Sequence, residues 1–235
     1  MRSIKIIRSG TTLRDDEVWA HGFKGAELRN LEERLGTLAL STIILVKTAG
    51  VNILIDTSWE GYMPSSEKPV DDLNRLTFEL QCHGLKPKDI DEIFVTHWHG
   101  DHYGNIPLFP RAKVLFAGIK ESRVSGYLSE MSAGNELTEM RDGEDWYPGI
   151  RLMATPGHSN HDHSVIIQYG KNTFVAAGDS IVSKMYYDRG TFFPNARERT
   201  HLELHKESFR KIVETADFIL PGHGGPFFNY RKGKL

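Results

Sequence analysis

Short apolar runs, each closed by glycine, proline or polar residues, recur along the chain, and such runs are typical of β-strands. Residues 38–48 and 51–55 form the first pair, and the Ala49-Gly50 dipeptide between them predicts a tight hairpin turn. The same pattern predicts further strands at residues 90–95, 113–116, 150–154, 164–169, 173–177 and 217–220.

Segments whose apolar residues have helical spacing lie between these strands. Residues 71–83 predict a helix capped by Asp71 or Asp72, whose apolar face consists of Leu73, Leu76 and Leu80. Pro87 predicts a short helical turn. Two further helices are predicted at residues 119–129 and 200–215. Because strands dominate the centre of each half and helices come between them, the pattern favours an α/β (α+β) protein with helices packed outside a pair of sheets.

The end of the predicted strand 90–95 is followed by an unusual cluster of polar side chains. Three histidines and an aspartate occupy six positions, namely His97, His99, Asp101 and His102. A buried core gives no reason to place these residues together. Imidazole and carboxylate are both ligands of first-row metals. The cluster therefore predicts a metal site where a strand ends in a loop.

Three more candidate ligands follow other apolar segments. His158, Asp179 and His223 each stand beside a glycine at the end of such a segment. Glycine permits close packing of backbone and ligands in sharp turns. Ligand-bearing ends on several strands favour one converging site over unrelated turns.

Composition and charge narrow the class of protein. The chain has 235 residues, a net charge of −2 and a pI near 6.6. A near-neutral chain is not drawn to nucleic acid or anionic membranes by bulk electrostatics. Cys82 is the sole cysteine, so no internal disulfide can form, which fits a reducing cytoplasm. The first residues contain no apolar signal region, and no apolar run is long enough to span a bilayer.

The ordered set of H-x-H-x-D-H at 97–102, a lone histidine, a Gly-Asp and a final Gly-His resembles the metallo-β-lactamase superfamily. The match runs from Asp56 to His223 and so covers most of the chain. The resemblance implies an αβ/βα four-layer sandwich, which we expect to form a single domain over residues 1–235. It also implies a pair of metal ions whose ligands are His97, His99 and His158 for the first, Asp101, His102 and His223 for the second, and Asp179 as a bridge.

Asp56 has a supporting role in this resemblance. It follows an early predicted strand, where it would orient a ligating imidazole from behind. The favoured metal is zinc, with iron or manganese as alternatives. Two divalent ions roughly 3.5–4 Å apart can share a bridging hydroxide whose pKa falls toward about 7. Asp101 is then expected to ligate the second ion and to accept or carry a proton.

This chemistry predicts hydrolysis, but the ligands alone do not select the substrate. The bridging Asp179 argues against a true β-lactamase, because those members of the superfamily lack it. Lactonases that cleave acyl-homoserine lactones carry a tyrosine where this chain has Val182, although Tyr186 or Tyr187 could substitute. We favour an ester-, thioester- or lactone-like small molecule. The alternatives are a phosphodiesterase or nuclease, a mononuclear iron enzyme resembling persulfide dioxygenases, and a non-catalytic metal-binding or partner-binding protein.

Several other residues have more than one interpretation. Aromatic side chains could line a substrate cleft, pack in the core or form a homodimer contact, and they are Trp59, Tyr62, Tyr186, Tyr187 and Phe192. His161 and His163 could border the metal site or belong to a loop or sheet. His201 and His205 neighbour glutamates and are expected on an exposed helix face without a ligand.

Overall fold

The computed structural model describes residues 2–10, 40–58, 72–192 and 202–234. Its strands form two mixed sheets. The first sheet has the order β1 (Ser3–Arg8), β2 (Ile43–Thr48), β3 (Val51–Ile55), β4 (Glu92–Phe94), β5 (Lys113–Phe116) and β6 (Leu137–Glu139). The second has the order β12 (Phe227–Phe228), β11 (Phe218–Pro221), β10 (Asn172–Gly178), β9 (His163–Tyr169), β8 (Ile150–Ala154) and β7 (Asp145–Tyr147).

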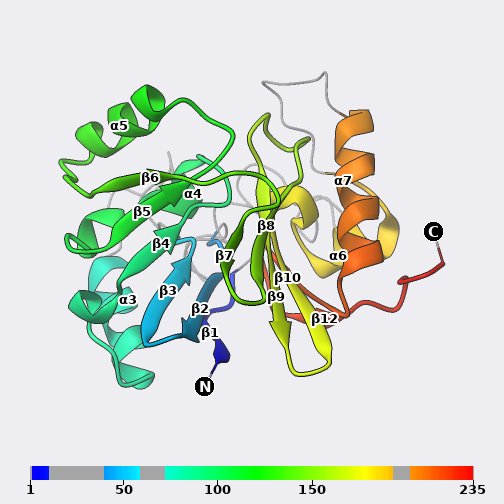
Figure 1. Cartoon of the computed structure of the whole chain (residues 1–235), viewed down its shortest axis with the longest axis horizontal. Coiled ribbons are helices and arrows are strands. Elements are labelled where there is room, and N and C mark those ends of the chain that lie inside the picture. The colour runs from blue at the N-terminus through cyan, green and yellow to red at the C-terminus, as the bar shows by residue number, and fades with distance from the viewer. Residues whose placement is uncertain (1, 11–39, 59–71, 193–201, 235) are drawn as a thin grey trace, which may run out of the picture.

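Helices cover the outer face of each sheet (Figure 1). The α-helices are α3 (Asp72–Cys82), α4 (Gly100–Tyr103), α5 (Glu121–Glu130), α6 (Lys184–Arg189) and α7 (Leu202–Thr215). Short 3-10 turns are η2 (Pro87–Asp89), η3 (Ile106–Leu108) and η4 (Asp179–Ile181). Helices α3 and α5 lie on the first sheet, and α7 lies on the second. This order of layers confirms the predicted αβ/βα sandwich.

Successive residues of a strand point to opposite faces of its sheet, and both faces of the first sheet are buried. Leu45, Leu54, Ile93 and Val114 are neighbours in register across β2 to β5, and they face α3 and α5. An adjacent residue of each strand belongs to the other face, and the row in register there consists of Ile44, Ile55, Phe94 and Leu115. That second row packs in the apolar layer between the sheets. A strand buried on both faces must be apolar at successive positions, as these runs are.

The predicted elements match the structure closely in the core. Ala49 and Gly50 both have positive φ, as a two-residue hairpin turn requires. Leu76 and Leu80 of α3 are fully buried, which confirms part of the predicted apolar face, while Asp71 lies outside the described residues.

The prediction of a strand from residue 38 was too long. β2 begins only at Ile43, because the backbone of Thr42 instead donates to Gly222 O at 2.7 Å. Four strands were not predicted from the sequence, namely β1, β6, β7 and β12. All four are edge strands, where half-exposed residues weaken the apolar pattern.

Strand direction brings five chain segments to one edge of the sandwich. β3 and β4 are parallel neighbours, as are β10 and β11. β8 runs in the same direction as β10, because each is antiparallel to β9. The loops after these strands carry the predicted site residues, so parallel strand ends place them together.

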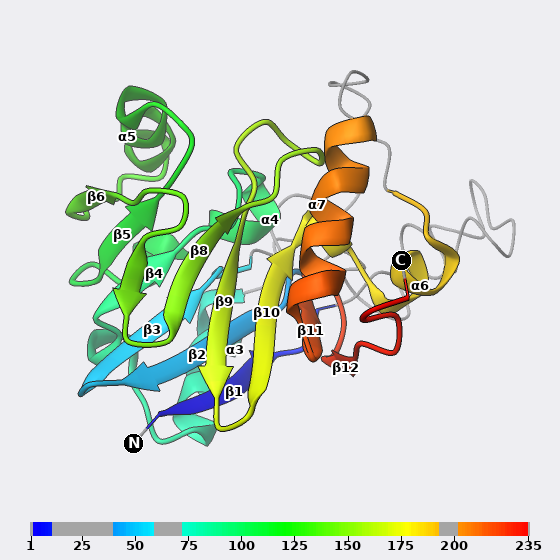
Figure 2. The ribbon, with the colours of Figure 1, turned by 45° about the vertical axis from the view of Figure 1, so that its right-hand side comes forward.

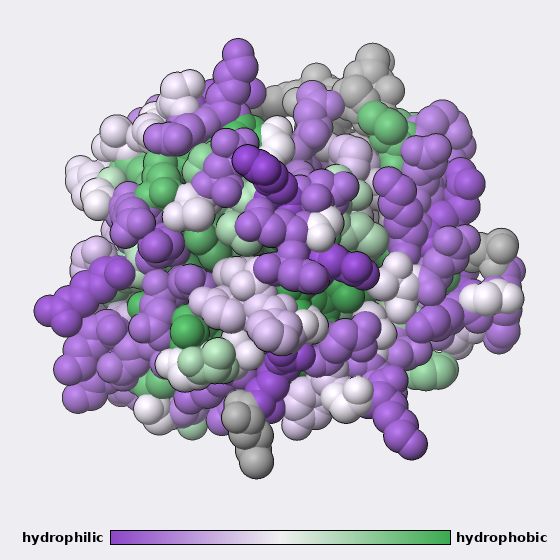
Figure 3. Space-filling view, in the orientation of Figure 1, coloured by the Kyte–Doolittle hydropathy of each residue, from purple (hydrophilic) through white to green (hydrophobic). Residues whose placement is uncertain are grey.

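A helix that spans a membrane must be both long and apolar. No helix within the described residues is both long enough and apolar enough to cross a bilayer. The face shown in Figure 3 is mostly hydrophilic, with apolar side chains in small scattered patches.

Candidate metal centre

The loop after β4 and the short helix α4 present four of the predicted ligands. His97 and His102 are buried, whereas Asp101 keeps part of its side chain exposed. α4 begins directly after His99, and the backbone N–H of His102 donates to His99 O at 2.9 Å. This single helical turn lets ligands close in sequence face different parts of the same site.

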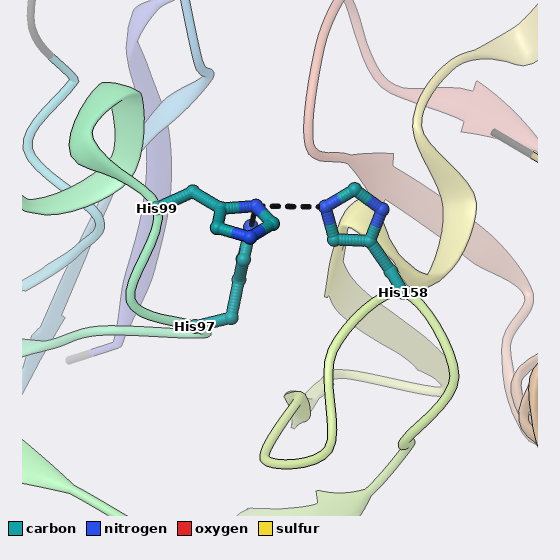
Figure 4. A group of neighbouring side chains, drawn as sticks. All are labelled: His97, His99 and His158. Atoms are coloured by element: carbon teal, nitrogen blue, oxygen red, sulfur yellow. Dashed lines mark hydrogen bonds between the residues drawn. The ribbon is translucent and has the colours of Figure 1, made fainter. Parts of the chain in front are cut away.

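His97, His99 and His158 form the first ligand group, which we call the three-histidine group (Figure 4). His99 Nδ1 lies 3.0 Å from His97 Nε2 and 2.9 Å from His158 Nε2. A ring nitrogen carries at most one hydrogen, so it cannot donate to both neighbours at full strength. Three converging imidazole nitrogens are better satisfied by a shared cation.

Asp101, His102 and His223 form the second group, which we call the aspartate group. Asp101 Oδ2 lies 3.8 Å from His102 Nε2 and 3.5 Å from His223 Nε2. His223 comes from the loop after β11, so this group joins the two sheets. One carboxylate and two imidazoles again suit a first-row metal.

Asp179 lies between the two groups and faces both. Its Oδ2 is 3.3 Å from His158 Nε2 and 3.9 Å from His97 Nε2. Its Oδ1 is 3.4 Å from the Nε2 atoms of both His102 and His223. Each oxygen thus serves a different group, which is the geometry a bridging carboxylate needs.

Glycine is required beside this bridge. A Cβ at Gly222 would collide with Asp179 Oδ1, and Gly178 has φ of 50° next to the side chain of Thr96. A larger residue at position 222 would displace the carboxylate, and one at position 178 would collide with Thr96, whose hydroxyl donates to Asp56. The sequence signal of a glycine beside each ligand therefore has a steric cause at these two positions.

Oxygen atoms accept hydrogen bonds from the Nδ1 atoms of two of the imidazoles, those of His102 and His223. His102 Nδ1 lies 2.8 Å from Asp56 Oδ2, and Asp56 also accepts from Thr96 N and Oγ1 at 2.8 Å each. His223 Nδ1 donates to Leu40 O at 2.9 Å. With Nδ1 as the donor to these oxygens, Nε2 is the nitrogen that faces the site and would bind a metal once its proton is released. The structure thus places Asp56 where the sequence analysis expected a supporting group.

Burial and charge shift the pKa values of the two groups in opposite directions. Burial lowers the pKa of His158 to about 3, and burial with the neighbouring imidazoles holds that of His97 well below its usual value. Burial also opposes the charged form of His223, but Asp179 outweighs it and raises that pKa to about 9. The pKa of His102 is raised against its burial by Asp179, Asp56 and Asp101.

Asp179 itself stays ionised in this setting. Burial would raise its pKa, but His223, His102 and His158 hold the pKa well below the usual value for an aspartate. Among the described residues, no hydrogen bond is made by the buried atoms His102 Nε2 and Asp179 Oδ1. A pair of divalent ions would satisfy both atoms, so the residues fit the metals that the sequence implied. Their role as ligands stays a prediction.

The family model of the metallo-beta-lactamase superfamily matches residues 36–223. The chain belongs to this superfamily. The resemblance found in the H-x-H-x-D-H motif is therefore confirmed.

Relatives and solved structures agree with this family. The chain is 31% identical over 157 residues to metallo-beta-lactamase domain-containing protein 1 of Xenopus laevis, covering 66% of this chain and 63% of that protein. A Staphylococcus aureus structure assigned as a metal-dependent hydrolase has a TM-score of 0.67 at 20% identity, over 94% of this chain and 89% of that one. A structure of N-acyl homoserine lactone hydrolase has a TM-score of 0.62 at 20% identity, over 77% and 80%. At this identity the two structures establish the superfamily's fold.

The predicted cleft aromatics are only partly described. Trp59 and Tyr62 lie outside the described residues. Tyr186, Tyr187 and Phe192 border a small pocket of about 180 Å³, counting its open part, which adjoins Asp179. The hydroxyl of Tyr187 donates to Asn229 at 2.7 Å, and its ring is fully buried. Tyr187 therefore packs in the core, and Tyr186 and Phe192 are two of the ten residues that line this hollow.

His161 and His163 have different positions. His163 begins β9, and its backbone donates to Thr96 O at 3.0 Å, so it links the two sheets. His161 is half-buried on the loop after His158, and burial, with nearby His99 and Arg123, lowers its pKa to about 4. His161 thus borders the metal centre, whereas His163 is a sheet contact.

The expectation of an exposed His205 was wrong. The side chain is buried, and its Nε2 lies 3.0 Å from the carbonyl oxygen of Ser180, the residue directly after Asp179. The signal was present in the sequence: position 205 shares the helical spacing of Ser208, Phe209 and Ile212, which belong to the buried face of α7. Adjacent glutamates masked this pattern. His201 lies outside the described residues.

Proposed function

We propose that this protein is a metal-dependent hydrolase with two divalent ions, for which zinc is the favoured metal. The observation that carries the proposal is the position of Asp179, whose two oxygens face the two ligand groups separately. A single closed structural site would need only four ligands and is usually rich in cysteine. Seven converging imidazoles and carboxylates instead suit a catalytic pair.

The chain's own residues supply positioning and proton transfer. When bound, two divalent ions provide an activated water and polarise the oxygen that becomes negative. Asp101 is 27% exposed and Asp179 only 8%, so Asp101 is the carboxylate that can exchange a proton with solvent. Asp179 keeps its charge buried between the histidines. Asp101 is therefore proposed as ligand and proton carrier.

An ester-, thioester- or lactone-like small molecule is the proposed substrate. The similar fold of a lactone hydrolase supports this class. The chain's net charge of −2 gives no general attraction for nucleic acid. The matched segment covers less than two thirds of the curated Xenopus relative, so the activity of that whole protein is not transferred.

The primary test combines elemental analysis with a substrate panel. Protein purified without added metal would be measured for zinc, iron and manganese, then assayed on chromogenic esters, thioesters, lactones and bis-phosphodiesters. We expect two ions per chain and turnover of the first three classes. One tightly held iron per chain would favour the persulfide-dioxygenase alternative. Two metals without turnover of any substrate would favour the non-catalytic reading.

A second test separates a small molecule from nucleic acid. Phe192→Ala should raise KM for apolar substrates by roughly tenfold, as expected from losing about 1.5 kcal/mol of apolar burial, and should spare the metals. Phe228→Ala is the matched control, because Phe228 is 62% exposed on β12. Affinity that falls steeply with salt and ignores Phe192→Ala would instead support the phosphodiesterase or nuclease.

Location and assembly are also proposals. A chain with Cys82 as its sole cysteine has no internal disulfide to protect, which supports a cytoplasmic location. A homodimer is the proposed assembly to test, by light scattering of the metal-loaded protein across a range of concentrations. A constant monomer mass over that range would remove it.

A further inference from the structure

Helix α7 lies against two loops that carry predicted ligands and are distant in sequence, namely the loop after β8 and the loop after β10 (Figure 2). His205 Nε2 lies 3.0 Å from Ser180 O, next to the bridging Asp179. One turn later, Ser208 Oγ donates to Pro156 O at 2.7 Å, two residues before His158. The same helix face thus binds one loop that carries a bridge and one that carries a ligand.

The packing at this contact is close. Gly157 has φ of 143°, and a Cβ there would collide with the backbone and Cβ of His205. The two loops are also joined directly, because Ser180 Oγ donates to Thr155 O at 2.8 Å. Little space is left for either loop to move independently of α7.

The chemistry of the His205 contact is directional. A carbonyl oxygen only accepts, so Nε2 must carry the hydrogen that is donated to Ser180. The side chain is 3% exposed, and without this donor the buried carbonyl would be left unsatisfied. Docking of α7 does not need a polar residue here, since Phe209, Ile212 and Val213 already bury its face against the sheet. The histidine therefore has a role that an apolar residue could not fill.

We propose that His205, assisted by Ser208, is a positioning residue that fixes Asp179 relative to His158 and so sets the affinity of the centre for its metals. The inference rests on the metal binding proposed above, but not on any substrate. Groups that orient ligands from outside the coordination sphere commonly change metal affinity about 10–100-fold when removed. The proposal gives α7 a role in the metal centre although none of its residues is a ligand.

The test compares three variants of one helix. His205→Leu removes the donor and keeps apolar volume, His205→Gln restores an amide donor, and Glu207→Gln is the exposed control. Zinc affinity would be measured by competition with a chromophoric chelator, and the geometry of the centre by the Co²⁺ absorption spectrum. We expect an affinity loss of about 10–100-fold for His205→Leu, substantial recovery for His205→Gln and no change for the control.

A purely structural role would give a different pattern. A lower melting temperature of His205→Leu is expected under both roles, because Ser180 O loses its donor. A purely structural role predicts in addition that His205→Gln does not restore metal affinity, and that result would overturn the proposal. An unchanged affinity and Co²⁺ spectrum in His205→Leu would also overturn it. Should His205→Leu fail to fold, Ser208→Ala deletes only a hydroxyl, and we expect a several-fold loss of affinity; no loss would count against the proposal.

Failure of the proposed hydrolase function can be distinguished from failure of the role proposed for His205. Wild-type protein that binds two ions but hydrolyses nothing would contradict the hydrolase, while the affinities of the variants would still decide the role of His205. Wild-type protein that binds no metal would contradict both.

Discussion

The two ligand groups differ most in how their charges are balanced. In the three-histidine group, burial holds the pKa values of His97 and His158 low, so these imidazoles are neutral near pH 7. In the aspartate group, carboxylates raise the pKa values of His102 and His223, which therefore carry protons in the metal-free protein. Protons in the aspartate group thus take the place of a cation.

The two groups also differ in which carboxylates raise the pKa values of their histidines. Asp56, Asp101 and Asp179 all raise the pKa of His102, whereas Asp179 is the carboxylate that raises the pKa of His97 and His158. We therefore expect the three-histidine group to accept its ion without proton release. The aspartate group must exchange protons for its ion.

The largest expected effect comes from removing the charge shared by both groups. Asp179→Asn keeps the shape of the side chain but leaves only one oxygen to accept a metal. Activity should fall by about 10⁴-fold or more, and metal content should drop below two ions per chain. Kinetics and elemental analysis check this, with the exposed Asp145→Asn as control. Near-normal activity at full metal loading would show that Asp179 does not bridge.

A smaller effect should follow from changing the aspartate group alone. Asp101→Ala is expected to lose on the order of 10³-fold in rate, because one ligand and the proton carrier are both removed. The three-histidine group should keep its ion, so the fold and one metal per chain remain. Metal content and circular dichroism would be measured beside turnover. A variant with two ions and normal turnover would remove Asp101 from the mechanism.

The third prediction concerns Asp56, which supports one group more than the other. In Asp56→Asn, the remaining oxygen can still accept from Thr96 N, but the amide cannot accept from His102 Nδ1. Affinity of the aspartate group should fall by about 10–100-fold, with less effect on the three-histidine group. Stepwise calorimetric titration with zinc separates the two. Equal losses at both steps would contradict this division.

The smallest expected effect is a difference in pH dependence. A proton on His223 competes with metal below its pKa of about 9, so binding to the aspartate group should weaken as pH falls, by roughly tenfold per pH unit for each displaced proton. His158, with a pKa of about 3, and His97, whose pKa is held well below its usual value, stay unprotonated, so binding to the three-histidine group should depend less steeply on pH than binding to the aspartate group. Calorimetry in buffers of different ionisation enthalpy counts the released protons. Equal proton release at both steps would be the contrary result.

Most core strands could be predicted from the chain because their burial on both faces demands successive apolar residues. The prediction at 113–116 coincides with β5, and that at 150–154 coincides with β8. The edge strand β12 could not be found this way, since its two residues pair with β11 on one side only. His205 was misplaced because the neighbouring glutamates outweighed a helical spacing of buried positions that the sequence does contain, and the close packing of His205 against Gly157 settles its position.

The sequence by itself determined the family and the identity of the candidate ligands, because ligand-type residues beside glycines at strand ends are a local pattern. Only the tertiary structure decided how they meet. Asp179 and His223 are far apart along the chain, and parallel β10 and β11 place them side by side. The division of Asp179 between two groups depends on the orientation of its two oxygens. Such an arrangement depends on the packing of two sheets, and no local sequence pattern records it.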